Sequence, residues 1–299
     1  MTAIDHQYFP HIIDVIFDTA PPASLAVMAR ACREWRDCVL SRFHHVQDVR
    51  IEQVDGAIQT VFYIPTKSNE GVYYNHVGLT PNCLGLLAGC KILDITEDPS
   101  RRTIRELPNL DTVRYHFDWQ AYTAISARQI VCAGHIYPIM EFDPTVKRLV
   151  IHSGGSSDYF YSNTYPDLCG LTSLEELVLL FEDVLSCLED FDYTEDELAE
   201  YSDEDLSPDL DCPLWLLSTV EDVIHAGLEQ GAKVLLVGTE LWNTYAFGAL
   251  KRGLMRTYDI ELTSADDGVT LMTVDGYREL VGEKEWEIET NFGSVVFSP

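Results

Sequence analysis

Short apolar segments recur along the chain, and their alternation with helical patterns constrains the fold more than any other feature. These segments are KILDIT (91–96), TVRYHF (112–117), KRLVIHS (147–153), LEELVLL (174–180) and KVLLVG (233–238). Helical patterns lie between several of them, at 119–131, 213–230 and 241–256. Strands that alternate with helices are typical of a parallel sheet with crossover connections. The sequence therefore predicts an α/β fold with a mainly parallel sheet.

The spacing of these strands leaves two topologies open. LPNLDTVRYHF (107–117) and LTSLEELVLLF (171–181) resemble leucine-rich repeat units, in which a leucine-bearing loop leads into a strand. The distances between strand centres are uneven, so no fixed repeat period applies. We expect an irregular α/β domain that is leucine-rich-repeat-like. A doubly wound nucleotide-binding sheet is the competing topology.

Further elements are expected on either side of this region. DVRIEQV (48–54) and AIQTVFYI (57–64) predict two strands that form a hairpin across Asp55-Gly56. DGYRELVG (275–282) predicts a short helix that ends at Gly282, since glycine is favoured just after the last helical residue. EWEIETNF (285–292) predicts a final strand.

Composition excludes several classes of partner. The 299 residues include 49 Asp and Glu against 20 Lys and Arg, a formal net charge of −29. Such a chain repels the phosphates of nucleic acids and anionic lipid surfaces, so we expect neither as a partner. No apolar run approaches the about 20 residues of a membrane-spanning helix, and the first residues lack the apolar stretch of a signal peptide.

The eight cysteines are scattered, and none forms a Cys-x-x-Cys pair. This is typical of buried, reduced thiols, so we expect a cytoplasmic or nuclear protein. A zinc site built from Cys83 and Cys90 lacks a second ligand pair at the usual spacing. We therefore expect no metal.

Motifs that would indicate catalysis are incomplete. HSGGSSD (152–158) follows a predicted strand as a phosphate-binding loop would, but no Gly-Lys-Ser/Thr follows it. KVLLVGTE (233–240) has a single glycine where a dinucleotide fold has several. Neither Gly-x-Ser-x-Gly nor His-Glu-x-x-His occurs. We expect no enzyme activity and no cofactor, and an α/β enzyme is the least favoured alternative.

Residues 182–211 stand apart because they carry fourteen acidic side chains. They lie in a longer stretch, 149–232, that contains no Lys or Arg. A run of like charges repels itself and stays solvated, which predicts a mobile surface insertion. Two roles stay open for it: contact with a basic partner, and a solvating linker, which we favour.

The first 46 residues follow a helical pattern and are predicted to form a separate module. PHIIDVIFDTA (10–20) places apolar residues on one helix face, and Pro21-Pro22 ends that helix. Ser24 is the expected N-cap of a second helix. Its apolar residues are Leu25, Met28, Ala29, Cys32, Trp35 and Val39. Two helices this short cannot bury every apolar side chain, so some need a partner surface.

Residues 9–46 resemble the F-box, a family pattern that begins with Leu-Pro and ends in Cys-x-x-Trp. The matching residues are Phe9, Pro10, Ile12, Ile16, Phe17, Leu25, Cys32 and Trp35. Phe9 stands where the family has Leu, and the step from Pro10 to Ile12 is one residue short. Ala20 is smaller than is usual at its position. These departures affect the expected docking register.

The resemblance implies a substrate-recognition adaptor that binds the Skp-type adaptor protein of a cullin–RING ubiquitin ligase. The expected adaptor-binding residues are Phe9, Pro10, Ile12, Ile16, Leu25, Met28, Cys32 and Trp35. Ala29 and Cys32 are expected to face inward. Leu25, Met28 or Trp35 is expected to face, at least partly, the partner or the following domain. The α/β domain, residues 47–299, would present a protein substrate.

The order of an F-box before irregular leucine-rich strands also resembles fungal F-box-like proteins with a degenerate repeat region. The alternative function is a protein-interaction scaffold whose F-box does not engage a ligase.

Overall fold

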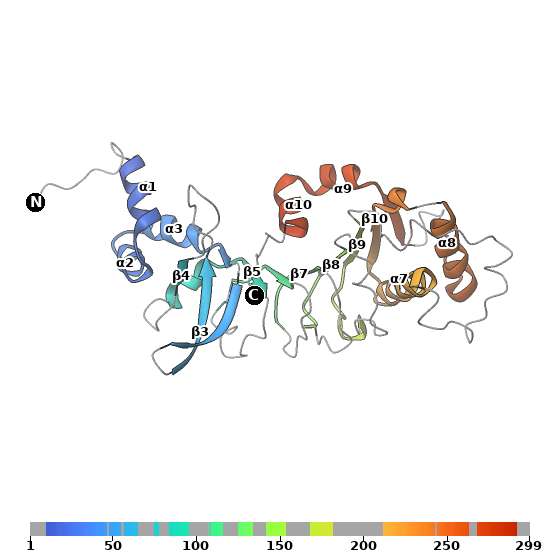
Figure 1. The fold of residues 1–299 in the computed structure, drawn as a ribbon, viewed down its shortest axis with the longest axis horizontal. Coiled ribbons are helices and arrows are strands. Elements are labelled where there is room, and N and C mark those ends of the chain that lie inside the picture. Colours follow the sequence, from blue (N-terminus) through green and yellow to red (C-terminus); the bar gives the residue numbers. More distant parts are fainter. Residues whose placement is uncertain are drawn as a thin grey trace, which may run out of the picture. The chain divides into compact units, whose positions relative to one another are not determined.

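The computed structural model describes residues 10–46, 48–54, 57–64, 75–77, 84–95, 107, 109–115, 125–133, 142–153, 168–181, 212–242, 244–262 and 268–291. The chain forms two compact units, residues 1–113 and 114–299 (Figure 1). The predicted helical module at 1–46 lies within the first unit. The described parts are mixed α/β with parallel strand pairing, as predicted. None of the described helices is both long and apolar enough to cross a membrane.

The first unit begins with the helices α1 (Pro10–Thr19), α2 (Pro22–Met28) and α3 (Arg33–Arg42). The single helix expected from Ser24 to Val39 is wrong, because the chain turns between α2 and α3. Ser24 is not a cap, since Pro21 holds the N-cap position of α2. Cys32 caps α3, where its Sγ accepts a hydrogen bond from the N–H of Trp35 at 3.5 Å.

The strands of the first unit form two sheets. They are β1 (His45–Val46), β2 (Asp48–Val54), β3 (Ala57–Ile64), β4 (Asn75–Val77) and β5 (Ile92–Ile95), with the 3-10 helix η1 (Leu84–Gly89) before β5. β2 and β3 pair antiparallel with Val54 opposite Ala57, which confirms the hairpin. β4 adds antiparallel to β3, and β1 pairs in parallel with β5. α3 packs closely on η1, because a Cβ added to Gly89 would stand 2.5 Å from the carbonyl oxygen of Leu40.

The boundary between the units falls inside β6 (Thr112–Tyr115). The strands that follow are β7 (Gln129–Ala133), β8 (Arg148–Ser153), β9 (Glu176–Phe181), β10 (Lys233–Val237) and β11 (Val269–Met272). The helical elements are η3 (Leu168–Gly170), α7 (Cys212–Glu229), η4 (Thr239–Leu241), α8 (Thr244–Tyr258), α9 (Val274–Val281) and α10 (Glu283–Thr290). From β7 to β11 each strand pairs in parallel with the next.

Side chains in a pleated sheet alternate between its two faces, and in β7 to β10 both faces are covered. One face packs Val150, Val178 and Leu235 against Tyr277 of α9 and Trp286 of α10 in a single core. The opposite face meets α7, whose Gly227 lies against Leu177 and Val234. Figure 1 shows α9 and α10 on one side of the strands and α7 on the other. Because helices cover both faces, the strands read as continuous apolar runs.

Four predicted helices and strands of this unit can be compared directly with the structure. The helices expected at 213–230 and 241–256 are confirmed as α7 and α8. The helix expected to end at Gly282 is confirmed as α9, and Gly282 has a φ of 81°. The strand expected at 285–292 is wrong, because residues 283–290 form α10.

The helix expected at 119–131 is also wrong where the structure describes it. Residues 129–133 form the strand β7, which is buried along its whole length. The strand β11 was not predicted. The acidic insertion at 182–211 lies outside the described residues, as do Phe9, Cys83 and residues 154–158.

Candidate functional site

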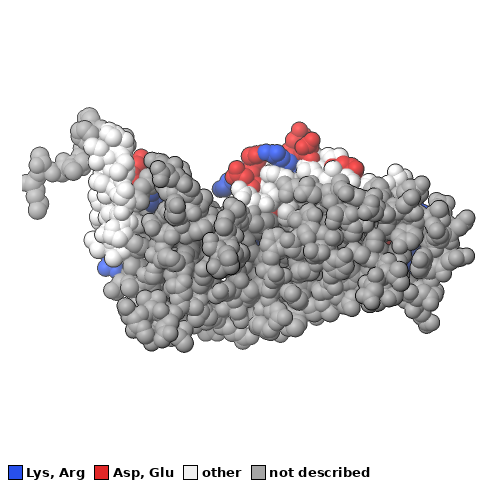
Figure 2. Space-filling model, viewed as in Figure 1, with Lys and Arg blue, Asp and Glu red and all other residues white. Residues whose placement is uncertain are grey.

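The helix α1 carries apolar side chains on two faces. Ile13 and Phe17 are buried, whereas Ile12, Val15 and Ile16 are exposed to solvent. These three residues are spaced i, i+3 and i+4, so they lie on one face of the helix. Val27 of α2 is exposed as well. We call Ile12, Val15, Ile16 and Val27 the apolar strip; their exposed fractions lie between 39% and 67%. Figure 2 shows α1 and α2 with a face of uncharged residues.

The inner face of α1 holds the three helices together. The ring of Phe17 meets the ring of Trp35 edge-on, with 5.6 Å between their centroids. The guanidinium of Arg42 lies 5.6 Å from the centroid of Phe17, so the ring has a cation over it as well. Leu25 of α2 and Val39 of α3 are buried as well. The helices therefore have a core of their own, to which the apolar strip does not contribute.

The structure separates the residues that the resemblance placed together. Ile12 and Ile16 are exposed as a docking surface requires, whereas Leu25 is buried and Met28 and Trp35 are half-buried. Pro10 is the first residue of α1. Ala29 is buried, which confirms its inward orientation, but Cys32 is exposed.

The expected inward orientation of Cys32 is therefore wrong. Of the three residues among which an outward orientation was expected, Leu25 is buried, whereas Met28 and Trp35 stay partly exposed. The physical reason for the error at Cys32 is the break between α2 and α3. In a continuous helix, Cys32 would have lain on the same face as Leu25 and Ala29. Instead Cys32 caps the new helix α3, so the helical spacing of side chains starts again there. Sequence reasoning also missed Val15 and Val27. The three-residue step from Ile12 signals Val15, whereas nothing in the sequence distinguishes Val27.

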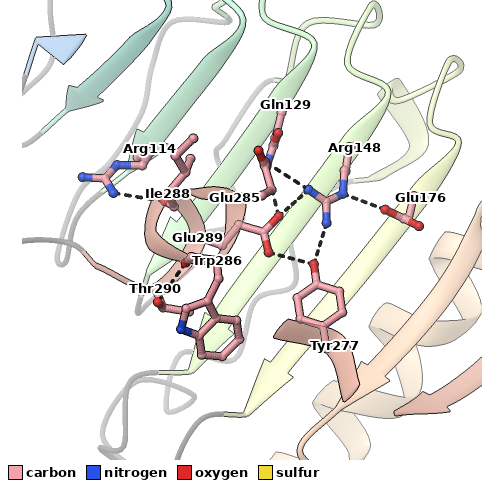
Figure 3. Close-up of polar contacts among 10 residues, drawn as sticks. All are labelled: Arg114, Gln129, Arg148, Glu176, Tyr277, Glu285, Trp286, Ile288, Glu289 and Thr290. Carbon is pink, nitrogen blue, oxygen red and sulfur yellow. Dashed lines mark hydrogen bonds and ion pairs between the residues drawn. The ribbon is translucent and has the colours of Figure 1, made fainter. Parts of the chain in front are cut away.

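A second cluster of interest is polar, and it lies on the sheet of the second unit (Figure 3). Arg148 of β8 donates from Nε to Oε2 of Glu176 at 2.6 Å and from Nη2 to the hydroxyl of Tyr277 at 2.5 Å. Its Nη1 donates to Oε1 of Glu289. The hydroxyl of Tyr277 in turn donates to Oε2 of Glu289 at 2.7 Å. The guanidinium thus bonds with the neighbouring strand and with both C-terminal helices.

Further contacts extend this polar cluster along α10. Gln129 donates from Nε2 to Oε1 of Glu289 at 3.2 Å. Arg114 donates from Nη1 to the carbonyls of Ile288 and Asn291, at 3.0 and 2.7 Å. A cation at these carbonyls satisfies acceptors that the last turn of a helix leaves open and complements the helix dipole.

The electrostatics of the polar cluster follow from its burial. Burial raises the pKa of Glu289, whose side chain is fully buried, while the charge of Arg148 acts in the opposite direction. Burial also raises the pKa of the Tyr277 hydroxyl. Burial disfavours the charged form of Arg148, yet Glu289 and the other partners raise its pKa overall, so it stays charged. The side chains of the polar cluster bond mainly to one another, and these hydrogen bonds attach α9 and α10 to the sheet.

A pocket of about 370 Å³ lies at the carboxyl ends of β10 and β11. Its lining residues are Thr239, Glu240, Trp242, Thr244, Phe247, Leu271, Met272 and Thr273. In α/β proteins the carboxyl ends of parallel strands are the usual place for ligands. Glu240 is the one titratable side chain among these lining residues, and the others are threonine, aromatic and aliphatic side chains.

Metal ligation has no support in the described part of the chain, where no three His, Cys, Asp or Glu side chains are arranged to hold an ion. The buried Sγ of Cys90 instead donates to the carbonyl of Ile92 at 3.3 Å. Comparison with protein-family models, with curated proteins and with solved structures gives no match to this chain. The likeness to the F-box therefore rests on residues 9–46 alone.

Proposed function

We propose that this protein is an F-box-like, non-enzymatic adaptor that links a protein substrate to a Skp–cullin–RING ubiquitin ligase. The N-terminal helices bind the Skp-type adaptor, and the α/β part, with its leucine-rich-repeat-like strands, holds the substrate. This role requires a cytoplasmic or nuclear location. The observation that carries the proposal is the apolar strip, because it lies in the segment with the F-box pattern and has a surface suited to a partner.

The distribution of exposed apolar side chains supports this assignment. Among the described residues, the other large exposed ones are Met255, Leu271 and Leu280. They belong to three different elements, whereas α1 alone carries three members of the strip. Single exposed apolar residues need no explanation, but a row along one helix face is typical of a helix that packs against a partner.

The proposal assigns the residues of the N-terminal helices to two roles. Ile12, Val15, Ile16 and Val27 form the proposed contact with the Skp-type adaptor. Leu25 and Trp35 hold the helices together, and Cys32 caps α3. A charge at Leu25 would therefore test folding of the helices, and a binding test needs changes on the strip.

The test compares two variants of the full chain for binding to a purified Skp-type adaptor. Val15→Asp/Ile16→Asp places two charges in the proposed contact, where one unpaired desolvated charge costs about 2–5 kcal/mol. We expect at least about a thirtyfold loss of affinity by calorimetry, which is about 2 kcal/mol. Leu280→Asp changes an equally exposed apolar residue on α9 and is expected to bind as the wild type does.

Equal binding by the wild type and the double variant would contradict the proposal. The scaffold alternative predicts a different result: the wild-type chain would not bind the Skp-type adaptor, although its helices are folded. Circular dichroism at the same concentrations confirms that each chain is folded.

A further inference from the structure

We propose that the pocket at the ends of β10 and β11 binds the basic side chain of an extended peptide, with arginine preferred. This inference deepens the proposed function, because it names the class of substrate segment that the second unit would recognise. It depends on four observations: the position of β11, the carboxylate of Glu240, the aromatic ring of Phe247 and the indole of Trp242.

The strand β11 offers a place for the peptide backbone. It pairs with β10 on one side, and it is the last strand of its sheet in the described part of the chain. Leu271 of β11 is exposed and lines the pocket. An edge strand presents N–H and C=O groups that an added peptide strand can pair with, and adjacent pockets then select side chains.

Glu240 supplies the charge that selects a cation. Its Oε1 accepts a hydrogen bond from the N–H of Val274 at 2.9 Å, which holds the carboxylate in place at the start of α9. The structure gives Oε2 no partner among the described residues. A guanidinium can therefore bond to Oε2 without breaking the contact to Val274. The formal net charge of −29 favours the approach of the same kind of ligand.

The ring of Phe247, which lines the pocket, already has a cation over it. The ammonium of Lys251 lies 4.8 Å from the centroid of the Phe247 ring, one helical turn further along α8. The ring of a phenylalanine is negative over both faces, so a ligand cation gains from the same ring. A flat guanidinium suits the ring of Phe247 better than an ammonium does, because a guanidinium stacks on aromatic faces.

Trp242 lines the pocket as well. This residue is 6% exposed and packs edge-on against Phe181, with 4.7 Å between the ring centroids. Its indole N–H is buried and has no acceptor in the described part of the chain. Buried donors are nearly always paired, so an unpaired donor in a residue that lines a pocket points to a missing acceptor. The indole N–H is also a reporter for binding.

The experiment uses the full-length 15N-labelled protein and two small probes. One probe is N-acetyl-arginine N-methylamide, and the other is the same compound with citrulline, which has nearly the same shape without the charge. The indole N–H signal of Trp242 is assigned with the variant Trp242→Phe. We expect the arginine probe to shift this signal saturably and the citrulline probe to leave it in place. No shift with arginine, or an equal shift with citrulline, overturns the proposal.

Glu240→Gln is the matched variant, because the amide oxygen can still accept from Val274 while the charge is lost. We expect the arginine probe to bind it about fivefold more weakly, the loss typical of an exposed ion pair. Glu279→Gln on α9 removes an exposed charge outside the pocket and is expected to bind as the wild type does. Equal binding by Glu240→Gln and the wild type overturns the proposal. Neither result depends on the Skp-type adaptor, so the two proposals can fail separately.

Discussion

Arg148 is the residue on which the polar contacts of the second unit converge. A buried guanidinium is stable only when carboxylates or other acceptors surround it, and Glu176, Glu289 and Tyr277 meet this need. These residues are separated by up to 141 positions in the chain. The cluster could not be predicted from the sequence, because the contact depends on the register of β8 and β9 and on α10 being a helix.

Arg148→Met is expected to lower the free energy of unfolding by about 3–5 kcal/mol at pH 7, because it leaves the buried carboxylate of Glu289 unpaired. Burial raises the pKa of Glu289 above its unfolded value, so the free energy of unfolding falls as pH rises through the interval between the two values. The loss should therefore be smaller at pH 5 than at pH 7 in urea unfolding. In Arg148→Met/Glu289→Gln this pH dependence should disappear. An equal loss at both pH values in the single variant would show that Glu289 does not titrate.

Two errors of prediction at the scale of elements arise because the buried positions do not follow the apolar pattern of the sequence. Residues 130–133 of β7 are all buried, so they lack the alternation of a half-exposed strand. In α10 the buried pair is Trp286 and Glu289, spaced as on a helix. Because Glu289 is acidic, the apolar pattern of the sequence does not include it. The alternation of Trp286 and Ile288 with glutamates therefore predicted a strand. The helix expected at 10–20 is confirmed as α1, but its apolar residues lie on two faces and not on one.

Gly238 directly follows β10, and we expect it to be essential because the end of β9 lies close to its backbone. Its φ is 86°, and an added Cβ would stand 1.9 Å from the carbonyl oxygen of Phe181. Gly231 has a φ of 75°, with nothing within 4 Å of an added Cβ, and so serves as the matched control. Gly231→Ala should cost about 1–2 kcal/mol, from backbone strain alone. Gly238→Ala should cost about 1–3 kcal/mol more in urea unfolding, because the clash adds to the strain. Equal losses of unfolding free energy in the two variants would show that β9 moves away from Gly238 at no cost.

At the scale of the whole molecule the dominant quantity is the excess of negative charge. The sequence gives this excess directly, 49 acidic against 20 basic residues, whereas the division at residue 113 follows from tertiary contacts that composition cannot supply. The described ion pairs use mainly arginine and lysine of the second unit, such as Lys147 with Glu175 and Arg278 with Glu283. With so few cations, most carboxylates have like charges as their long-range neighbours, which destabilises a compact state.

Moderate salt is therefore expected to stabilise this protein. At about 10 mM ionic strength the repulsion between carboxylates reaches about 30 Å, and at about 0.15 M it is confined to about 8 Å. Raising NaCl between these limits should increase the melting temperature by about 2–4 °C for each kcal/mol of repulsion removed. The two exposed ion pairs above weaken in salt, but exposed ion pairs contribute little to stability, so the repulsion dominates. Differential scanning calorimetry at pH 7 measures the change, with sucrose of equal osmolality as the control. A melting temperature that falls with NaCl would mean that ion pairs outweigh the net charge.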